Sequence, residues 1–156
     1  MPSTATARAP TCSTCRLGRA WLALAGAVAL HVTDEALTGF VDVWNPTVAA
    51  IHARWPSVQL PIFRFDVWLA GLISLVVLLF LLSPMFFRGG GFMRVPAYVF
   101  ALIMVGNGVA HSVATIVGHT VPEVTFARPA PGFYSSPLLI AAAVWVLVEL
   151  HRSRRD

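Results

Sequence analysis

The residues best suited to chemistry are three ionisable side chains inside an apolar run, His31, Asp34 and Glu35. The run extends over residues 20–41, which is long enough to cross a bilayer as a helix. Each ionisable group at membrane depth costs about 2.5–3.5 kcal/mol on insertion scales, so such groups usually serve a function. In a helix, His31 shares a face with both carboxylates, which follow it by three and four residues. We therefore expect chemistry or binding at this stretch.

A second polar pair, Asn107 and His111, lies within the apolar run 95–118. The two residues are four apart, so they share one helix face. If the two runs cross the membrane in the same direction, Asn107 matches His31 in depth and His111 matches Glu35, because each residue of a helix adds about 1.5 Å. We expect these side chains to form one buried polar cluster, with His31, Asp34, Glu35, Asn107 and His111 as candidate catalytic residues.

Buried carboxylates need a cation or a hydrogen-bond donor, and several arrangements can supply one. A metal can bind His31, Glu35 and His111, the combination of ligands found in catalytic zinc and non-haem iron sites. Without a metal, a carboxylate–histidine pair can act as a general acid and base. Intramembrane carboxylates and histidines also form proton or ion relays. The remaining alternative is structural, in which the polar groups hold the two helices together.

The proline-rich loop 120–136 and its approach supply three candidate substrate-binding residues, His119, Arg128 and Tyr134. His119 follows His111 by two turns and can line a path from the outer surface. Arg128 and Tyr134 can hold an anionic head group or bring the loop over the polar cluster. Pro131-Gly132 is equally well explained as a simple turn.

Composition indicates an integral membrane protein of one domain. The chain has 156 residues, of which 57% are hydrophobic and 12% charged, and its mean hydropathy is +0.74. Soluble domains carry about 25% charged residues. All the basic residues other than histidine are arginines, and they cluster at predicted helix ends, which argues against nucleic-acid binding and for membrane lipids as the partners. Protein partners are not indicated. The lack of lysine is typical of a GC-rich bacterial genome.

The hydropathy pattern predicts an all-α fold, a four-helix transmembrane bundle within residues 20–150. The predicted spans are residues 20–41, 66–87, 95–118 and 134–150. Between the first two spans we predict a short amphipathic helix at the membrane interface. Asn45 is its expected N-cap, Pro46 its first residue and Arg54 its approximate end.

Both ends of the chain are predicted to lie outside the bundle. Residues 1–19 have the composition of a disordered tail, and residues 151–156 form a basic tail. The basic start and the first apolar run also resemble a signal peptide, but the apolar run resumes after Glu35 and three more follow. Cys12 and Cys15 form a lone CxxC pair without the further ligands of a zinc site, so we expect the pair to be dispensable.

The arginines favour a multi-pass protein of the bacterial plasma membrane with both termini in the cytoplasm. This topology leaves only Arg54, Arg64 and Arg128 outside. The inner side then holds all the others, namely Arg8, Arg16, Arg19, Arg88, Arg94, Arg152, Arg154 and Arg155. Such an excess agrees with the positive-inside rule.

The polar motifs resemble those of the HXXEE-domain family of multi-spanning membrane proteins, over roughly residues 20–150. The family motif His-x-x-Glu-Glu corresponds to His31-Val32-Thr33-Asp34-Glu35, with aspartate in place of the first glutamate. Its further histidine corresponds to His111. Its Tyr-x-Pro-Gly motif corresponds to Pro129-Ala130-Pro131-Gly132, which lacks the tyrosine, and the nearby Tyr134 is a possible substitute.

This resemblance implies a multi-spanning helical membrane protein whose polar residues are suspected of enzymatic activity, and it places His31, Glu35 and His111 in one site. The hypothesis is therefore a membrane-embedded enzyme, with or without zinc or iron, that acts on a lipid-like substrate. The alternative is a non-catalytic membrane protein that binds a small lipid or stabilises a partner complex, with the polar cluster joining the helices.

The predicted topology can be tested with reporters that are active on only one side of the membrane. Fusions at Gly90 and at the C-terminus should both report the cytoplasm, because each follows an arginine-rich helix end. A fusion within loop 120–136 should report the opposite side and serves as the control. If either of the first two fusions reports the outside, the depth matching of the two polar pairs is wrong.

Overall fold

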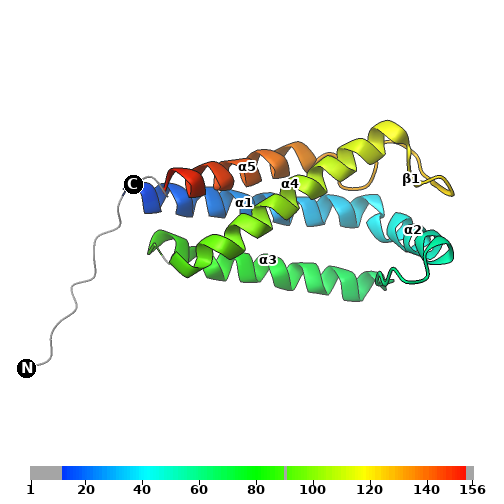
Figure 1. Ribbon diagram of the computed structural model, residues 1–156, viewed down its shortest axis with the longest axis horizontal. Coiled ribbons are helices and arrows are strands. Elements are labelled where there is room, and N and C mark those ends of the chain that lie inside the picture. Colours follow the sequence, from blue (N-terminus) through cyan, green and yellow to red (C-terminus); the bar gives the residue numbers. More distant parts are fainter. Residues whose placement is uncertain (1–11, 90, 154–156) are drawn as a thin grey trace, which may run out of the picture.

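The fold is known from a computed structural model that describes residues 12–89 and 91–153 (Figure 1). It contains five α-helices: α1 (Cys12–Thr38), α2 (Phe40–Arg54), α3 (Phe65–Phe87), α4 (Arg94–Val117) and α5 (Ser136–Arg152). A 3₁₀ turn, η1 (Gly91–Met93), precedes α4, and a small antiparallel hairpin, β1 (His119–Val121) and β2 (Val124–Thr125), follows it. The predicted helical fold is confirmed, and the hairpin within the proline-rich loop was not predicted.

Three helices are long and apolar enough to cross a membrane. They are α1 from Cys15 onward, α3, and α4 together with η1. The α5 helix has 17 residues, fewer than the roughly 20 that a perpendicular span needs. The fourth predicted span therefore remains a prediction.

The start of α1 corrects the predicted tail. Residues 12–19 are helical, whereas the sequence predicted disorder through residue 19. Leu17 is buried in the core, and a Cβ at Gly18 would lie only 2.6 Å from the Phe87 ring, so tertiary packing orders this segment. Residues 1–11 and 154–156 and the side chain of Cys12 lie outside the described part of the chain, so the role of the CxxC pair is not tested.

The junction between α1 and α2 also differs from the prediction. The first helix ends at Thr38 rather than residue 41, because Gly39 adopts a left-handed conformation with φ of 78°. The next helix starts at Phe40, so Asn45 is not its N-cap. Instead, the Asn45 side chain accepts a hydrogen bond from the Phe63 backbone N–H at 3.0 Å and donates one to the Phe63 carbonyl at 2.8 Å. These bonds tie the segment before α3 to α2.

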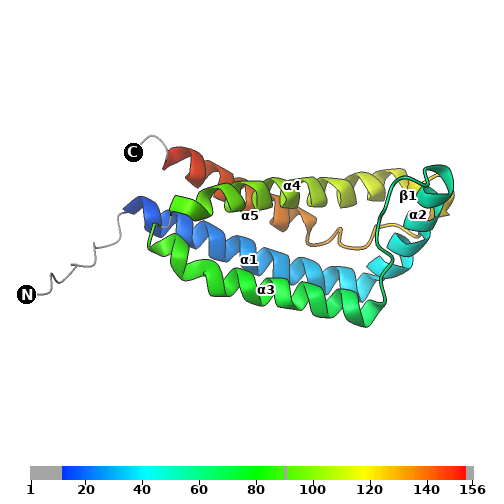
Figure 2. The ribbon, with the colours of Figure 1, turned by 60° about the horizontal axis from the view of Figure 1, so that its bottom comes forward.

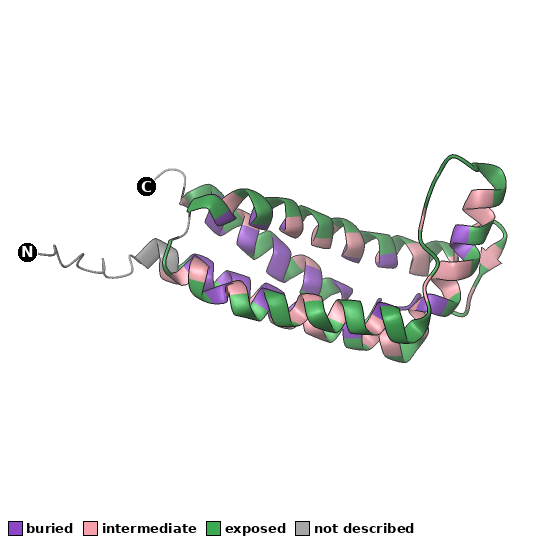
Figure 3. Cartoon of the chain, turned by 90° about the horizontal axis from the view of Figure 1, so that it is seen from below, coloured by how far each residue is buried: buried purple, intermediate pink, exposed green. Residues whose placement is uncertain are grey.

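The α1 helix is the centre of the molecule. It packs against α3 on one side and α5 on the other, and α4 packs closely on α5 (Figure 2). Although α3 and α4 are consecutive, they are not among the helix pairs that pack closely. Half of the residues in the apolar segment of α1 are buried, whereas only small fractions of the residues in the apolar segments of α3 and α4 are. The outer faces of α3 and α4 are largely exposed (Figure 3). The most polar of the long helices is thus the one best shielded from lipid.

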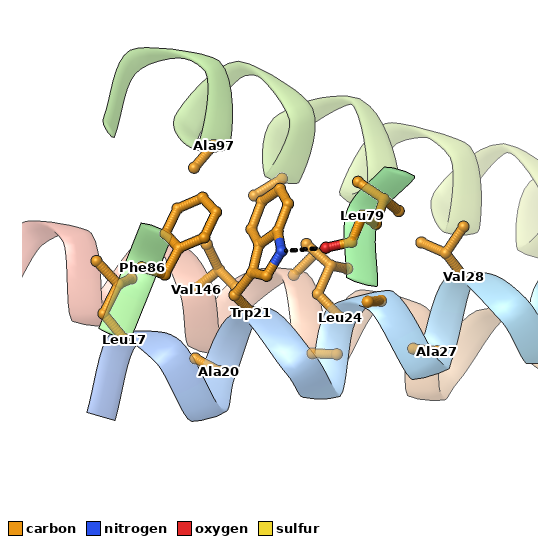
Figure 4. Close-up of a cluster of buried hydrophobic side chains, with 14 of the residues drawn as sticks. Leu17, Ala20, Trp21, Leu24, Ala27, Val28, Leu79, Phe86, Ala97 and Val146 are labelled. Atoms are coloured by element: carbon orange, nitrogen blue, oxygen red, sulfur yellow. Dashed lines mark hydrogen bonds between the residues drawn. The ribbon is translucent and has the colours of Figure 1, made fainter. Parts of the chain in front are cut away.

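The core is built around Trp21 of α1 (Figure 4). Its indole stacks on the Phe86 ring with the centroids 4.1 Å apart, and its N–H donates a hydrogen bond of 2.9 Å to the Leu79 carbonyl. Small buried residues such as Ala20 and Ala97 allow the helices to approach closely, as in other membrane bundles.

The polar turn between α3 and α4 lies at the same end of the molecule as the start of α1 and the end of α5 (Figure 1). The α2 helix and the β1–β2 hairpin lie at the opposite end, which is called the loop end below. The candidate site lies between α1, α4 and the loop that leads into α5.

Substitution Trp21→Ala should lower the free energy of unfolding in mixed micelles by about 3–5 kcal/mol, because it leaves a large cavity and removes the indole hydrogen bond to the Leu79 carbonyl. The matched control is Trp145→Ala on α5, since Trp145 is 43% exposed whereas Trp21 is 3% exposed. The control should cost much less. Equal losses for the two variants would contradict a core centred on Trp21.

Candidate functional site

His31 and Glu35 of α1 and His111 of α4 form a buried cluster. They are only 3%, 5% and 8% exposed. Glu35 Oε1 lies 3.1 Å from His111 Nε2 and 3.5 Å from His31 Nε2. One ligand atom from each residue lies within 4.8 Å of the others, so the three side chains can hold a metal ion. The structure thus brings together the three residues that the sequence nominated as ligands, while their function stays a prediction.

Helix geometry and one close contact position these side chains. His31 and Glu35 are neighbours because they are four residues apart on α1. His111 is held in place by the packing of α4 on α5 one turn earlier, at Gly108. A Cβ at Gly108 would lie 2.6 Å from Ile140 Cγ1, so only glycine permits this close approach without a shift of Ile140.

Asp34 belongs to the site through a serine. Its Oδ2 atom accepts hydrogen bonds of 2.8 Å from both the backbone N–H and the hydroxyl of Ser135. The Ser135 hydroxyl also lies 2.8 Å from His31 Nδ1. The Ser135 hydroxyl already has two acceptors, Asp34 Oδ2 and, at 3.2 Å, the Gly132 carbonyl, so the arrangement favours donation from His31 Nδ1–H to Ser135 Oγ. Asp34 and the Gly132 carbonyl thus favour one tautomer of His31 through Ser135.

This tautomer leaves His31 Nε2 as an acceptor. The Asn107 side-chain amide donates to it at 2.9 Å, in agreement with the assignment. Both Asn107 and His111, chosen from the sequence by depth and helix face, thus reach residues of α1. His31 Nε2 also lies 3.5 Å from Glu35 Oε1, and the rings of His31 and His111 lie edge to face with centroids 4.9 Å apart.

The loop before α5 closes the cluster with Gly132. This glycine has φ of 79°, and a Cβ there would lie 2.9 Å from His31 Cε1 and 3.0 Å from both Glu35 Cγ and His111 Cε1. Its N–H donates to Thr38 Oγ1 at 3.2 Å, and its carbonyl accepts from the Ser136 hydroxyl at 2.7 Å. Of the two interpretations of Pro131-Gly132, the turn is present and it also covers the polar cluster.

The three predicted substrate-binding residues have different surroundings. Arg128 Nη2 donates to the Val117 carbonyl at 3.1 Å, so its guanidinium interacts with the C-terminal end of α4. His119 lies in β1, where its buried Nδ1 has no hydrogen-bond partner in the described part of the chain. Tyr134 is 70% exposed and lies beside Asp34 and Ser135 on the surface. Of the three, Tyr134 is the one that shares a surface groove with Asp34.

The roles of Ser135 and Thr38 in the site were not predicted from the sequence. Their importance depends on how loop 129–135 folds back over α1, and a lone serine or threonine in a sequence does not indicate such a contact. The one available signal was their position, since Thr38 follows Asp34 by four residues and Ser135 follows the Pro-Gly turn.

The charge of the cluster is not balanced by arginine. In residues 12–89 and 91–153, neither Asp34 nor Glu35 forms an ion pair with an arginine. The buried Glu149 of α5 provides the contrast, because Arg152 lies 3.0 Å and Arg16 3.5 Å from its carboxylate. A buried carboxylate needs a compensating charge, or it takes up a proton. If Glu35 is ionised, its compensating charge comes from a protonated histidine or from a bound cation.

A small cavity of about 50 Å³ adjoins His111 toward the loop end. Its lining is mostly apolar, with contributions from Phe40, Phe126 and Pro131. A cavity needs about 10–15 Å³ for a water molecule, so water or another small molecule fits beside the imidazole.

Comparison with protein-family models, curated proteins and solved structures gave no match. The function therefore has to be inferred from the residues of the site and their geometry.

Substitution Gly132→Ala should destabilise the protein by roughly 2–4 kcal/mol, because alanine adds left-handed strain and its methyl group would clash with both histidines. Unfolding in mixed micelles measures this loss. The control is Gly26→Ala in α1, where a Cβ would meet nothing within 4 Å. If the two variants are equally stable, the loop does not pack on the cluster.

Proposed function

We propose that this chain is a membrane-embedded enzyme in which His31, Glu35 and His111 hold a zinc or iron ion and act on a lipid-like substrate. The observation that carries the proposal is the convergence of the three buried ligand atoms within 4.8 Å. Two imidazoles and one carboxylate are typical of catalytic zinc and non-haem iron sites, which leave coordination positions open for water and substrate.

The surroundings of His31 support metal binding. Ligating histidines usually donate their other ring N–H to an oxygen that sets the tautomer and the ring orientation. His31 Nδ1 has such a partner in Ser135, which is in turn held by Asp34. Asn107 now donates to the Nε2 lone pair, which a cation would take instead. A bound ion would act as a Lewis acid and activate water.

The charge of the site independently supports a bound metal ion. Glu35 is buried between two histidines without an arginine among the described contacts, whereas Glu149 has two. A divalent cation would compensate Glu35 without requiring a charged imidazole. The types of ligand atom and the charge of the site therefore both favour a bound divalent cation.

We also propose that the chain belongs to the HXXEE-domain family. Three segments that resemble the family motifs, at His31–Glu35, His111 and Pro131-Gly132, lie far apart in the sequence and meet at this one cluster. In the same proposal, the protein resides in the bacterial plasma membrane with both termini in the cytoplasm. The start of α1 and the end of α5 lie at the same end of the molecule, as that topology requires (Figure 1).

One observation favours a structural alternative. The α1 and α4 helices are not among the closely packed pairs, and His31–Asn107 and Glu35–His111 are direct polar links between them. Interhelical hydrogen bonds of this kind stabilise membrane bundles by about 0.6–2 kcal/mol each. In this alternative the cluster joins helices and the protein is not catalytic.

Protein purified in detergent without chelators should contain nearly stoichiometric zinc or iron by elemental analysis. Glu35→Gln and His111→Ala should each lose the metal, because each removes one of three protein ligands. Glu149→Gln is the matched control, since it neutralises a buried carboxylate at the opposite end of the molecule. Absence of metal from wild type, even after incubation with either ion, would contradict the metal site.

The structural alternative is tested by combining Asp34→Asn with Glu35→Gln. If the cluster is an active site, this variant should fold with nearly unchanged thermal stability and lose the biological phenotype of the protein, because amides preserve the size and some hydrogen bonds of the carboxylates. A large loss of stability together with metal-free wild-type protein would support helix joining instead.

A further inference from the structure

Two surface grooves of similar size flank the half of α1 that is nearer to the loop end. One lies between α1 and α3, has a volume of about 360 Å³ and is lined by apolar residues such as Val32, Leu69 and Ile73 together with Thr33. The other lies between α1 and α5 and has a volume of about 400 Å³. Its lining consists of Leu30, Thr33, Asp34, Leu37, Tyr134, Ser135 and Leu138. Only the second groove, called the α1–α5 groove below, contains an ionisable residue.

Asp34 offers an acceptor to this groove. Both hydrogen bonds from Ser135 go to Oδ2, and in the described part of the chain no hydrogen bond reaches Oδ1. Oδ1 is also not among the buried atoms without a partner, so it is accessible. A carboxylate oxygen on an otherwise apolar surface is costly unless a donor pairs with it. The α1–α5 groove therefore suits a ligand that is mostly hydrocarbon and carries one donor.

We propose that the α1–α5 groove binds a single-chain lipid whose head donates a hydrogen bond to Asp34, either a hydroxyl or an ammonium group. The inference deepens the proposed function, on which it rests, by naming the class of substrate and the surface groove that holds it beside the site.

The order of residues along the groove favours one direction of the ligand. Leu30 precedes Asp34 by one turn of α1, and Leu138 follows Ser135 by about one turn of α5, which runs antiparallel to α1 (Figure 1). Both leucines therefore lie farther from the loop end than the polar pair, whereas Leu37 lines the groove on the other side of Asp34. The head thus lies at Asp34 and Ser135, and the chain runs along Leu30 and Leu138 toward the middle of the bundle.

Charge and size narrow the class of lipid. No arginine lines the groove, and the Asp34 carboxylate repels an anionic head. A volume of about 400 Å³ lies near the lower end of the range of about 300–1,000 Å³ seen for ligand pockets, which suits one hydrocarbon chain better than the two of a phospholipid.

The groove is directly connected to the buried cluster. Ser135 Oγ lies 2.8 Å from both Asp34 Oδ2 and His31 Nδ1. A head group bound at Asp34 is therefore separated from His31 by one hydroxyl group.

The test is photolabelling of the full-length protein in nanodiscs with alkyl diazirine probes of one chain length that carry an ammonium, hydroxyl or carboxylate head. The ammonium or hydroxyl probe should label residues that line the α1–α5 groove at least about tenfold more than the carboxylate probe, as expected for a hydrogen bond to a charged group. Leu138→Trp should fill the groove and remove this labelling. Ile73→Trp, in the groove between α1 and α3, is the matched control and should retain it.

Asp34→Asn provides a second readout that does not depend on groove filling. It should reduce the preference for the ammonium or hydroxyl probe over the carboxylate probe by about tenfold, because the amide lacks the negative charge. Equal labelling by all three probes overturns the proposal, as does labelling that persists in Leu138→Trp or that maps to the groove between α1 and α3.

The outcomes separate this inference from the proposed function. Selective labelling of a protein that contains no metal would overturn the metalloenzyme alone. Stoichiometric metal without selective labelling would overturn the α1–α5 groove as the lipid site and leave the metal centre in place.

Discussion

The structure depends on a buried carboxylate, Glu35, that two histidines contact and that no arginine neutralises within the described residues. Taking this group out of water is costly, so everything around it has to supply donors, charge or cover. His111 comes from α4, whose backbone does not pack closely on that of α1. Gly132 approaches so closely that a methyl group would not fit. Both α4 and the loop before α5 thus meet α1 at this one carboxylate.

The central position of α1 follows from the same constraint. Its two neighbours, α3 and α5, shield it from lipid, while the outer faces of α3 and α4 remain apolar and exposed (Figure 3). Buried carboxylates have different partners at the two ends of the molecule. Glu149 is paired with arginines, as expected of a structural ion pair, whereas Glu35 is left with neutral or titratable partners. This difference distinguishes the Glu35 cluster from the ion pairs of Glu149.

Asp34 and Glu35 are adjacent in the sequence but have separate roles. Glu35 lies inside the cluster with His111, whereas Asp34 reaches the surface and acts on His31 through Ser135. This relay connects a lipid-facing groove to a buried imidazole by one hydroxyl. The Asp34 side chain bonds directly to the backbone N–H of Ser135, the residue that precedes α5.

The sequence by itself determined the helices and the polar residues. Hydropathy located the long apolar segments, and helical spacing with matched depth paired His31 and Glu35 with Asn107 and His111, because these quantities depend only on local periodicity. The tertiary structure alone decided which residues complete the site. Gly39 ends α1 early, Leu17 and Gly18 order a segment that looked disordered, and Arg128 lies at the end of α4. The roles of Ser135 and Gly132 depend on a loop that folds back over α1, and contacts between residues a hundred positions apart leave no periodic signal in a single sequence.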